Sequence, residues 1–107
     1  MEAAAEVKVA DLERRAGEAA GFLRDLANEH RLMVLCRLAS LGEMTVTALS
    51  AAAGLSQSAL SQHLARLRED GLVTFRRDSQ TLHYSVIDQK ALRVLGLLKE
   101  IYCGDLM

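Results

Sequence analysis

The sequence contains no proline and no tryptophan, and aromatic residues make up only 4% of its 107 residues. A proline-free composition rich in leucine and alanine favours helices joined by short turns. No run of about 18 apolar residues occurs, so the sequence predicts no transmembrane helix and no membrane partner. The first ten residues lack a basic region followed by an apolar stretch, which argues against a signal peptide and predicts a cytoplasmic protein.

Motifs of the common enzyme classes are also missing. The sequence has no glycine-rich phosphate loop, no Gly-x-Ser-x-Gly elbow, no His-Glu-x-x-His and no Cys-x-x-Cys pair. Its three histidines have no obvious carboxylate partner. These absences predict a protein that is not an enzyme and that carries no cofactor.

The length allows a single domain over residues 1–107, and half of these residues are hydrophobic. The net charge of −1 argues, by itself, against a nucleic-acid binder. The charge is unevenly distributed, however. Residues 1–29 hold four Lys or Arg against seven Asp or Glu, whereas residues 30–84 hold six Lys or Arg against four Asp or Glu. The middle of the chain is therefore mildly basic, which gives weak support to DNA binding.

Apolar residues recur at helical spacing in five segments, and two further segments have the composition of strands. The predicted helices cover residues 11–27, 30–41, 45–53, 56–70 and 88–102, and the predicted strands cover residues 72–77 and 81–86. Ser56 and Asp88 are expected to cap helices, and Gly42, Gly54 and Gly71 to end them. The expected fold is mainly α with a β-hairpin wing: a winged helix-turn-helix of four helices, a hairpin and a last helix.

Residues 45–70 have the pattern of a helix-turn-helix, with a short first helix, a turn at Gly54 and a second helix whose outer face is small and polar. Glutamine can pair with adenine in the major groove, and serine can bind base edges or phosphates. The helix N-terminus also favours a phosphate oxygen. The candidate contacts are Ser56, Gln57, Ser58, Ser61, Gln62 and His63, followed by Arg66 and Arg68 for backbone phosphates.

The hairpin at residues 72–86 adds a second candidate contact with DNA. It carries Arg76 and Arg77 just before its turn and Gln80 within it, so we expect a wing that reaches a neighbouring groove. Taken alone, a Gln/Ser face is usually a solvated helix surface, and an arginine pair is usually a soluble strand edge. The order of turn glycine, small polar face and basic hairpin favours DNA binding over both explanations.

The run from Gly54 to Leu64, followed by Leu67 to Val73, resembles the signature of the ArsR/SmtB family of winged-helix repressors, and the likeness extends over residues 23–103. The resemblance implies a homodimer held together by the helices at residues 11–27 and 88–102. It also implies binding to an imperfect palindrome in double-stranded DNA, and release of that DNA when an inducer acts.

Metal-sensing members of that family hold their ligands at positions that differ here. Thr45 and Thr47 stand where a Cys-x-Cys motif would lie, and a hydroxyl is a poor ligand for As(III), Cd(II) or Zn(II). In the last helix Asp88 remains, but Lys90 replaces a histidine, and its ammonium would repel a cation. The sequence therefore predicts no metal site.

Two cysteines remain as candidate sensors. Cys36 alone is most simply a small core residue, whereas Cys103 near the C-terminus has no evident packing role. A cytoplasmic location argues against a structural disulfide. The pair, together with residues 29–36, resembles the persulfide-sensing branch of the family, the BigR/SqrR-like repressors. This resemblance implies that reactive sulfur species join Cys36 to Cys103 by a disulfide or polysulfide bridge and that the bridged protein releases its DNA.

Three alternatives stay open. A redox-sensing relative carries a similar cysteine pair, so peroxide or general oxidants could be the inducer. The protein could also be a metal- or metalloid-responsive repressor with a non-standard site. It could, finally, be a helical dimerisation module that binds no DNA.

Overall fold

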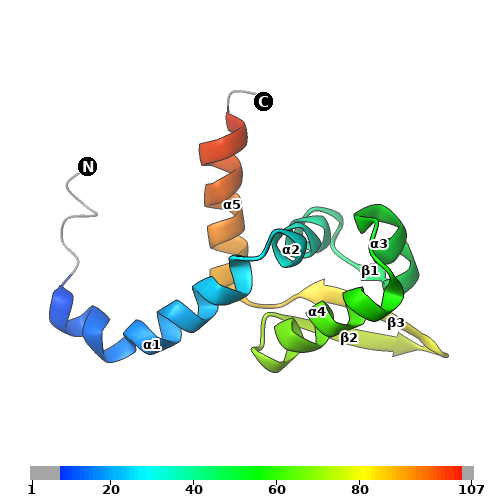
Figure 1. Ribbon diagram of the computed structural model, residues 1–107, viewed down its shortest axis with the longest axis horizontal. Helices are drawn as coiled ribbons and strands as arrows, with labels where there is room; N and C mark the ends of the chain where they lie inside the picture. Colours follow the sequence, from blue (N-terminus) through cyan, green and yellow to red (C-terminus); the bar gives the residue numbers. More distant parts are fainter. Residues whose placement is uncertain (1–7, 105–107) are drawn as a thin grey trace.

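The computed structural model describes residues 8–104, and its elements follow the expected order (Figure 1). They are α1 (Val9–Leu26), α2 (Glu29–Leu41), β1 (Met44–Thr45), α3 (Val46–Ala53), α4 (Gln57–Glu69), β2 (Val73–Asp78), β3 (Thr81–Val86) and α5 (Gln89–Cys103). The five predicted helices and both predicted strands are confirmed, with ends that shift by at most two residues. Residues 1–7, which include most of the segment used to predict localisation, and residues 105–107 lie outside the described residues.

The sequence analysis missed β1, which makes the hairpin into a three-stranded sheet. β1 pairs antiparallel with β3, with Met44 opposite Tyr84, and β3 pairs antiparallel with β2, so the strand order is β1-β3-β2. Two residues are too few to show the alternation of a strand. The pairing with β3 therefore creates this strand, and it ties the segment before α3 to the hairpin.

Side-chain caps fix where four of the helices begin. Ser56 and Asp88 accept hydrogen bonds from the backbone N–H of Ala59 and Lys90, which confirms both predicted caps. The side chain of Asn28 caps α2, and that of Thr45 caps α3 by accepting from the N–H of Ala48. Each cap satisfies a backbone donor that the first turn of a helix leaves without a partner.

The core is built around α2, which packs against each of the other four helices and against β3. Its residues Val34, Leu35 and Leu38 have no exposed surface. Around them lie Leu26 from α1, Leu49 from α3, Leu60, Leu64 and Leu67 from α4, Tyr84 from β3, and Ala91 and Leu95 from α5. Burying this apolar surface is the main stabilising term for a domain of this size.

Helices α1 and α5 reach beyond this core. In Figure 1, α1 extends to the left of the body and α5 rises above it. Their outer faces carry large apolar side chains that are exposed in the single chain, namely Val9, Leu12, Leu23, Leu97, Ile101 and Tyr102. Within residues 8–104 no helix is both long and apolar enough to cross a membrane.

Replacing a core leucine of α2 should cost far more stability than replacing an exposed one of the same helix. Leu38 has no exposed surface, whereas Leu41 is 67% exposed. Leu38→Ala should lower the free energy of unfolding by about 2–5 kcal/mol because it removes buried methyl groups and leaves a cavity. Leu41→Ala should change it by no more than about 0.5 kcal/mol. Urea unfolding at one fixed protein concentration measures both, and equal effects would contradict the central place of α2.

Candidate nucleic-acid interface and cysteine pair

Helix α4 is held against the core by one face, which leaves the other face free. Leu60, Leu64 and Leu67 are buried, and the turn before them is set by Gly54. The glycine has a φ of 68°, a left-handed conformation that strains most other residues. Ser50 stabilises the same turn by donating its hydroxyl to the carbonyl of Leu55. These contacts fix which face of α4 is buried and which face is exposed.

The polar residues predicted to contact DNA lie mostly on the free face of α4. Gln57, Ser58, Ser61 and Gln62 are all exposed. Ser56 precedes them, and its hydroxyl oxygen is 3.1 Å from the N–H of Ala59, so its side chain already serves as the helix cap. The structure thus brings the two glutamines and two serines together near the N-terminal end of one helix, where backbone N–H groups also point outward.

His63 is set apart from that group. It is partly buried, and its ring centre lies 6.1 Å from that of His30 on α2. Burial, with the neighbouring charges of Arg31 and His30, lowers the pKa of His63 below its ordinary value. This shift favours the neutral imidazole, so His63 is poorly suited to add positive charge to the interface.

The two arginines of α4 are engaged within the protein. The Nε of Arg66 donates to the Oδ1 of Asp25 on α1 at 2.9 Å, and this aspartate is almost fully buried. The guanidinium carbon of Arg68 lies 4.4 Å from the ring centre of Phe75 on β2, within the range of a cation–π contact. Arg66 was predicted to meet a phosphate; the structure gives it an internal partner, and the phosphate contact stays a prediction.

In the wing, the two neighbouring arginines differ in their surroundings. Arg76 makes a bidentate ion pair with Glu43, with N–O distances of 2.8 and 2.9 Å. These hydrogen bonds hold the pKa of Glu43 below its ordinary value, and the Nδ1 of His83 lies 4.0 Å from the same carboxylate. Arg77 points to the other face of the strand and is exposed, as is Gln80 in the turn.

Cys36 on α2 and Cys103 at the last position of α5 are both free thiols and both partly buried. Burial, which is the larger cause, and the charge of Cys103 together raise the pKa of Cys36. The helices that carry them, α2 and α5, pack against each other. The structure therefore places on two packed helices the two thiols that lie 67 positions apart in the sequence.

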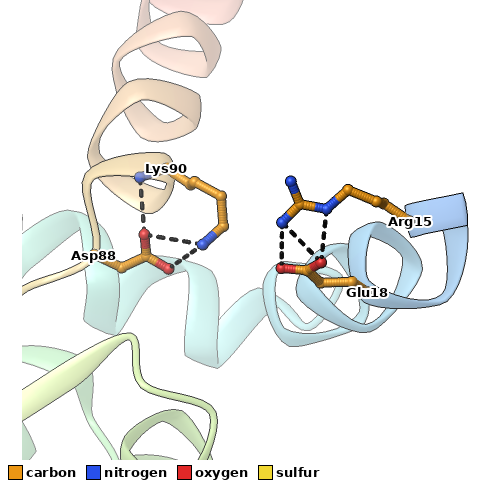
Figure 2. Close-up of polar contacts among 4 residues, drawn as sticks. All are labelled: Arg15, Glu18, Asp88 and Lys90. Carbon is orange, nitrogen blue, oxygen red and sulfur yellow. Dashed lines mark hydrogen bonds and ion pairs between the residues drawn. The ribbon is translucent and has the colours of Figure 1, made fainter. Parts of the chain in front are cut away.

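The positions of the family's metal sites are occupied by other interactions. Thr45 uses its hydroxyl to cap α3, and the Nζ of Lys90 lies 3.1 Å from the Oδ2 of Asp88, as Figure 2 shows. The lysine thus supplies the positive charge beside this carboxylate. Among residues 8–104, no group of three or more His, Cys, Asp or Glu side chains is placed to hold a metal ion.

Sequence reasoning missed Asp25 and Glu43, the internal partners of two arginines. Asp25 gave a usable signal, because it lies beside Leu26 and three positions after Phe22, on the inward side of α1, where a carboxylate needs a partner. Glu43 gave no such signal, because it lies in an exposed loop and meets Arg76 only through the pairing of β1 with the hairpin.

A surface cavity of about 260 Å³ adjoins Asp25, between α1 and the start of α5.

The raised pKa of Cys36 predicts slow alkylation of this thiol at neutral pH, because only the thiolate reacts. In a Cys103→Ser variant, the rate with iodoacetamide should rise about tenfold per pH unit up to a pKa above that of an ordinary cysteine. The same variant unfolded in urea is the control, and it should react faster at pH 7. Equal rates in the folded and unfolded protein would show that burial does not protect this thiol.

Comparison with known proteins gives a family model, "Bacterial regulatory protein, arsR family", that matches residues 28–74. Nodulation protein NolR of Rhizobium meliloti is 52% identical over 87 residues, which cover 81% of this chain and 70% of NolR. Transcriptional activator HlyU of Vibrio cholerae is 41% identical over 99 residues, covering 92% and 91%. The biofilm growth-associated repressor of Xylella fastidiosa strain 9a5c is 39% identical over 95 residues, covering 89% and 82%.

Solved structures of two of these relatives share the fold closely. The transcriptional repressor BigR from Xylella fastidiosa superposes with a TM-score of 0.83 at 37% identity, over 91% of this chain and 98% of that one. Reduced HlyU from Vibrio cholerae superposes with a TM-score of 0.81 at 43% identity, over 87% and 97%. The likeness therefore extends over most of this chain.

Proposed function

This chain belongs to the arsR family of bacterial regulatory proteins, and we propose that within this family it is a homodimeric transcriptional repressor that leaves its operator when Cys36 is bridged to Cys103. The inducers are reactive sulfur species, persulfides or polysulfides. The DNA-binding half of this proposal rests on two features. One is the exposed Gln/Ser face of α4, and the other is the exposed Arg77 in the wing. The sensing half rests on the two free thiols that the packed helices α2 and α5 carry.

The α4 face suits the major groove. Gln57 and Gln62 each present an amide that can bond with both N6 and N7 of adenine, and Ser58 and Ser61 add short hydroxyls that can reach base edges or phosphates. In the wing, Arg77 supplies a charge for the phosphate backbone. Arg76 is already paired with Glu43, so we expect it to contribute less to phosphate binding than Arg77.

The apolar faces of α1 and α5 favour a dimer. Leu12 and Leu23 on α1 and Leu97 and Ile101 on α5 are each more than half exposed in one chain, and a monomer would leave this surface in water. A two-fold arrangement covers the same patch on both chains at once. It also presents two α4 helices to the two half-sites of a palindrome, whose centres lie about one helical turn apart.

The sensing reaction is an oxidation of two thiols. Attack by one cysteine thiolate on a sulfane sulfur forms a cysteine persulfide, and attack by the second thiolate on that cysteine sulfur expels hydrosulfide. With hydrogen disulfide as the oxidant, two thiols and H₂S₂ give one disulfide and two H₂S. Hydrogen peroxide gives the same disulfide and two water molecules. The bridge joins α2, at the centre of the core, to α5, on the dimer side.

Gln62→Ala tests the DNA contact. Loss of a bidentate pair with adenine should cost about 1–3 kcal/mol for the operator, with little change for unrelated DNA. Arg77→Ala is the matched control, because loss of a phosphate contact should weaken binding to all sequences alike and flatten the salt dependence. Mobility-shift titrations with the protein's own upstream DNA measure both. Unchanged affinity and preference in a folded Gln62→Ala protein would contradict the assignment of α4.

Cys36→Ser and Cys103→Ser test the switch. Each variant should still bind DNA, but polysulfide should no longer release it, because one sulfur cannot complete the bridge. Polysulfide treatment of the wild type should lower operator affinity about tenfold or more, which corresponds to about 1.4 kcal/mol. Mass spectrometry of the same samples identifies a disulfide or a polysulfide. A single variant that responds like the wild type, or a release that requires a stoichiometric metal, would disprove the dithiol mechanism while leaving the repressor assignment intact.

A further inference from the structure

Asp25, near the C-terminal end of α1, accepts hydrogen bonds from residues of two other helices, α2 and α4. Its side chain is 2% exposed, and its Oδ1 accepts from the Nε of Arg66 on α4 at 2.9 Å. Its backbone carbonyl accepts from the Nε of Arg31 on α2, also at 2.9 Å, and the same guanidinium bonds to the carbonyl of Arg24 through Nη2. One residue at the C-terminal end of α1 is thereby bonded to α2 through its backbone and to α4 through its side chain.

Asp70, which ends α4, lies at the same node. A side-chain hydrogen bond with Asp25 is the largest of the causes that raise the pKa of Asp70, and Arg66 opposes that shift. Asp25 and Asp70 also line the same surface cavity. The C-terminal half of the recognition helix thus meets α1 through the guanidinium of Arg66, which is directed to Asp25.

A carboxylate this deeply buried is costly unless a positive charge compensates it. Arg66 supplies that charge from a side chain that remains 47% exposed, so the guanidinium is also reachable from solvent. Two roles are then possible for Arg66, a phosphate contact or an internal brace. The direction of its Nε, toward a carboxylate on a different helix 41 positions earlier, favours the brace.

We propose that Asp25 is a positioning residue that fixes the recognition helix α4 to the dimer helix α1 through Arg66, and thereby sets the distance between the two recognition helices of the dimer. This inference rests on the proposed function, because it assigns a role within a dimer that reads two half-sites. Since α1 is shared with the dimer surface, tilting α4 against α1 changes the half-site spacing that the protein accepts.

The test compares the wild type, Asp25→Asn and Arg66→Gln on the protein's upstream operator and on versions with one base pair added or removed between the half-sites. The wild type should bind the native spacing at least tenfold more tightly than either altered spacing. Asp25→Asn and Arg66→Gln should each lose about tenfold in affinity for the native operator and should bind the three spacings within about threefold of one another. Loss of stability alone would lower all three affinities together and keep their ratio.

The salt dependence separates the two roles of Arg66. As a brace, Arg66→Gln leaves the slope of log affinity against log salt unchanged, whereas Arg77→Ala lowers it by about one. An Arg66→Gln protein with a reduced slope and an intact spacing preference would overturn the inference and make Arg66 a phosphate contact. The double variant Asp25→Asn with Arg66→Gln retains a neutral hydrogen-bonding pair, and it should recover part of the spacing preference.

A readout without DNA keeps this inference separate from the proposed function. A spin label at Ala65→Cys, on the exposed side of α4, is introduced into a Cys36→Ser and Cys103→Ser background. Pulsed dipolar spectroscopy should give one narrow distance across the dimer, and Asp25→Asn should broaden it. Identical distributions would overturn the positioning role. A wild type that binds no upstream DNA would instead disprove the proposed function, and the label distances would still decide the role of Asp25.

Discussion

The burial of α2 is the constraint on which the rest of the molecule depends. Three of its side chains lose all contact with solvent, and the helix packs against each other helix and against β3. Because protein interiors are close-packed, a change in the position of α2 is passed to its neighbours rather than absorbed. Cys36 lies on this helix, so a bond formed there acts on the part of the structure that has the least freedom to adjust.

Three arginines of the protein have partners within the chain. Arg31 holds the end of α1, Arg66 compensates a buried carboxylate, and Arg76 is bonded to Glu43. These arginines contribute less to the outer surface, and the net charge of the chain is only −1. Recognition, as proposed, would depend on hydrogen bonds from the Gln/Ser face of α4 and on a small number of arginines.

The local features of the sequence predicted the local features of the fold. Helix periodicity, the caps at Ser56 and Asp88 and the turn at Gly54 depend on residues close together in the chain, and all were recognised correctly. β1 was missed because its two residues become a strand only by pairing with β3. The partners of Arg66 and Arg76 were missed for the same reason, because each lies more than 30 positions away and is brought close by tertiary packing.

The lack of tryptophan gives the protein a simple near-ultraviolet spectrum, in which two tyrosines absorb more strongly than the two phenylalanines. Tyr84 is 8% exposed and packs on Phe75, with ring centres 5.3 Å apart, whereas Tyr102 is 74% exposed and adjoins Cys103. A fixed, asymmetric environment gives a tyrosine its near-ultraviolet circular dichroism, and mobile packing removes it. The dichroism of the single chain therefore comes mainly from the wing. Burial of the C-terminal tyrosine would add a second, separable signal from the other end of the molecule.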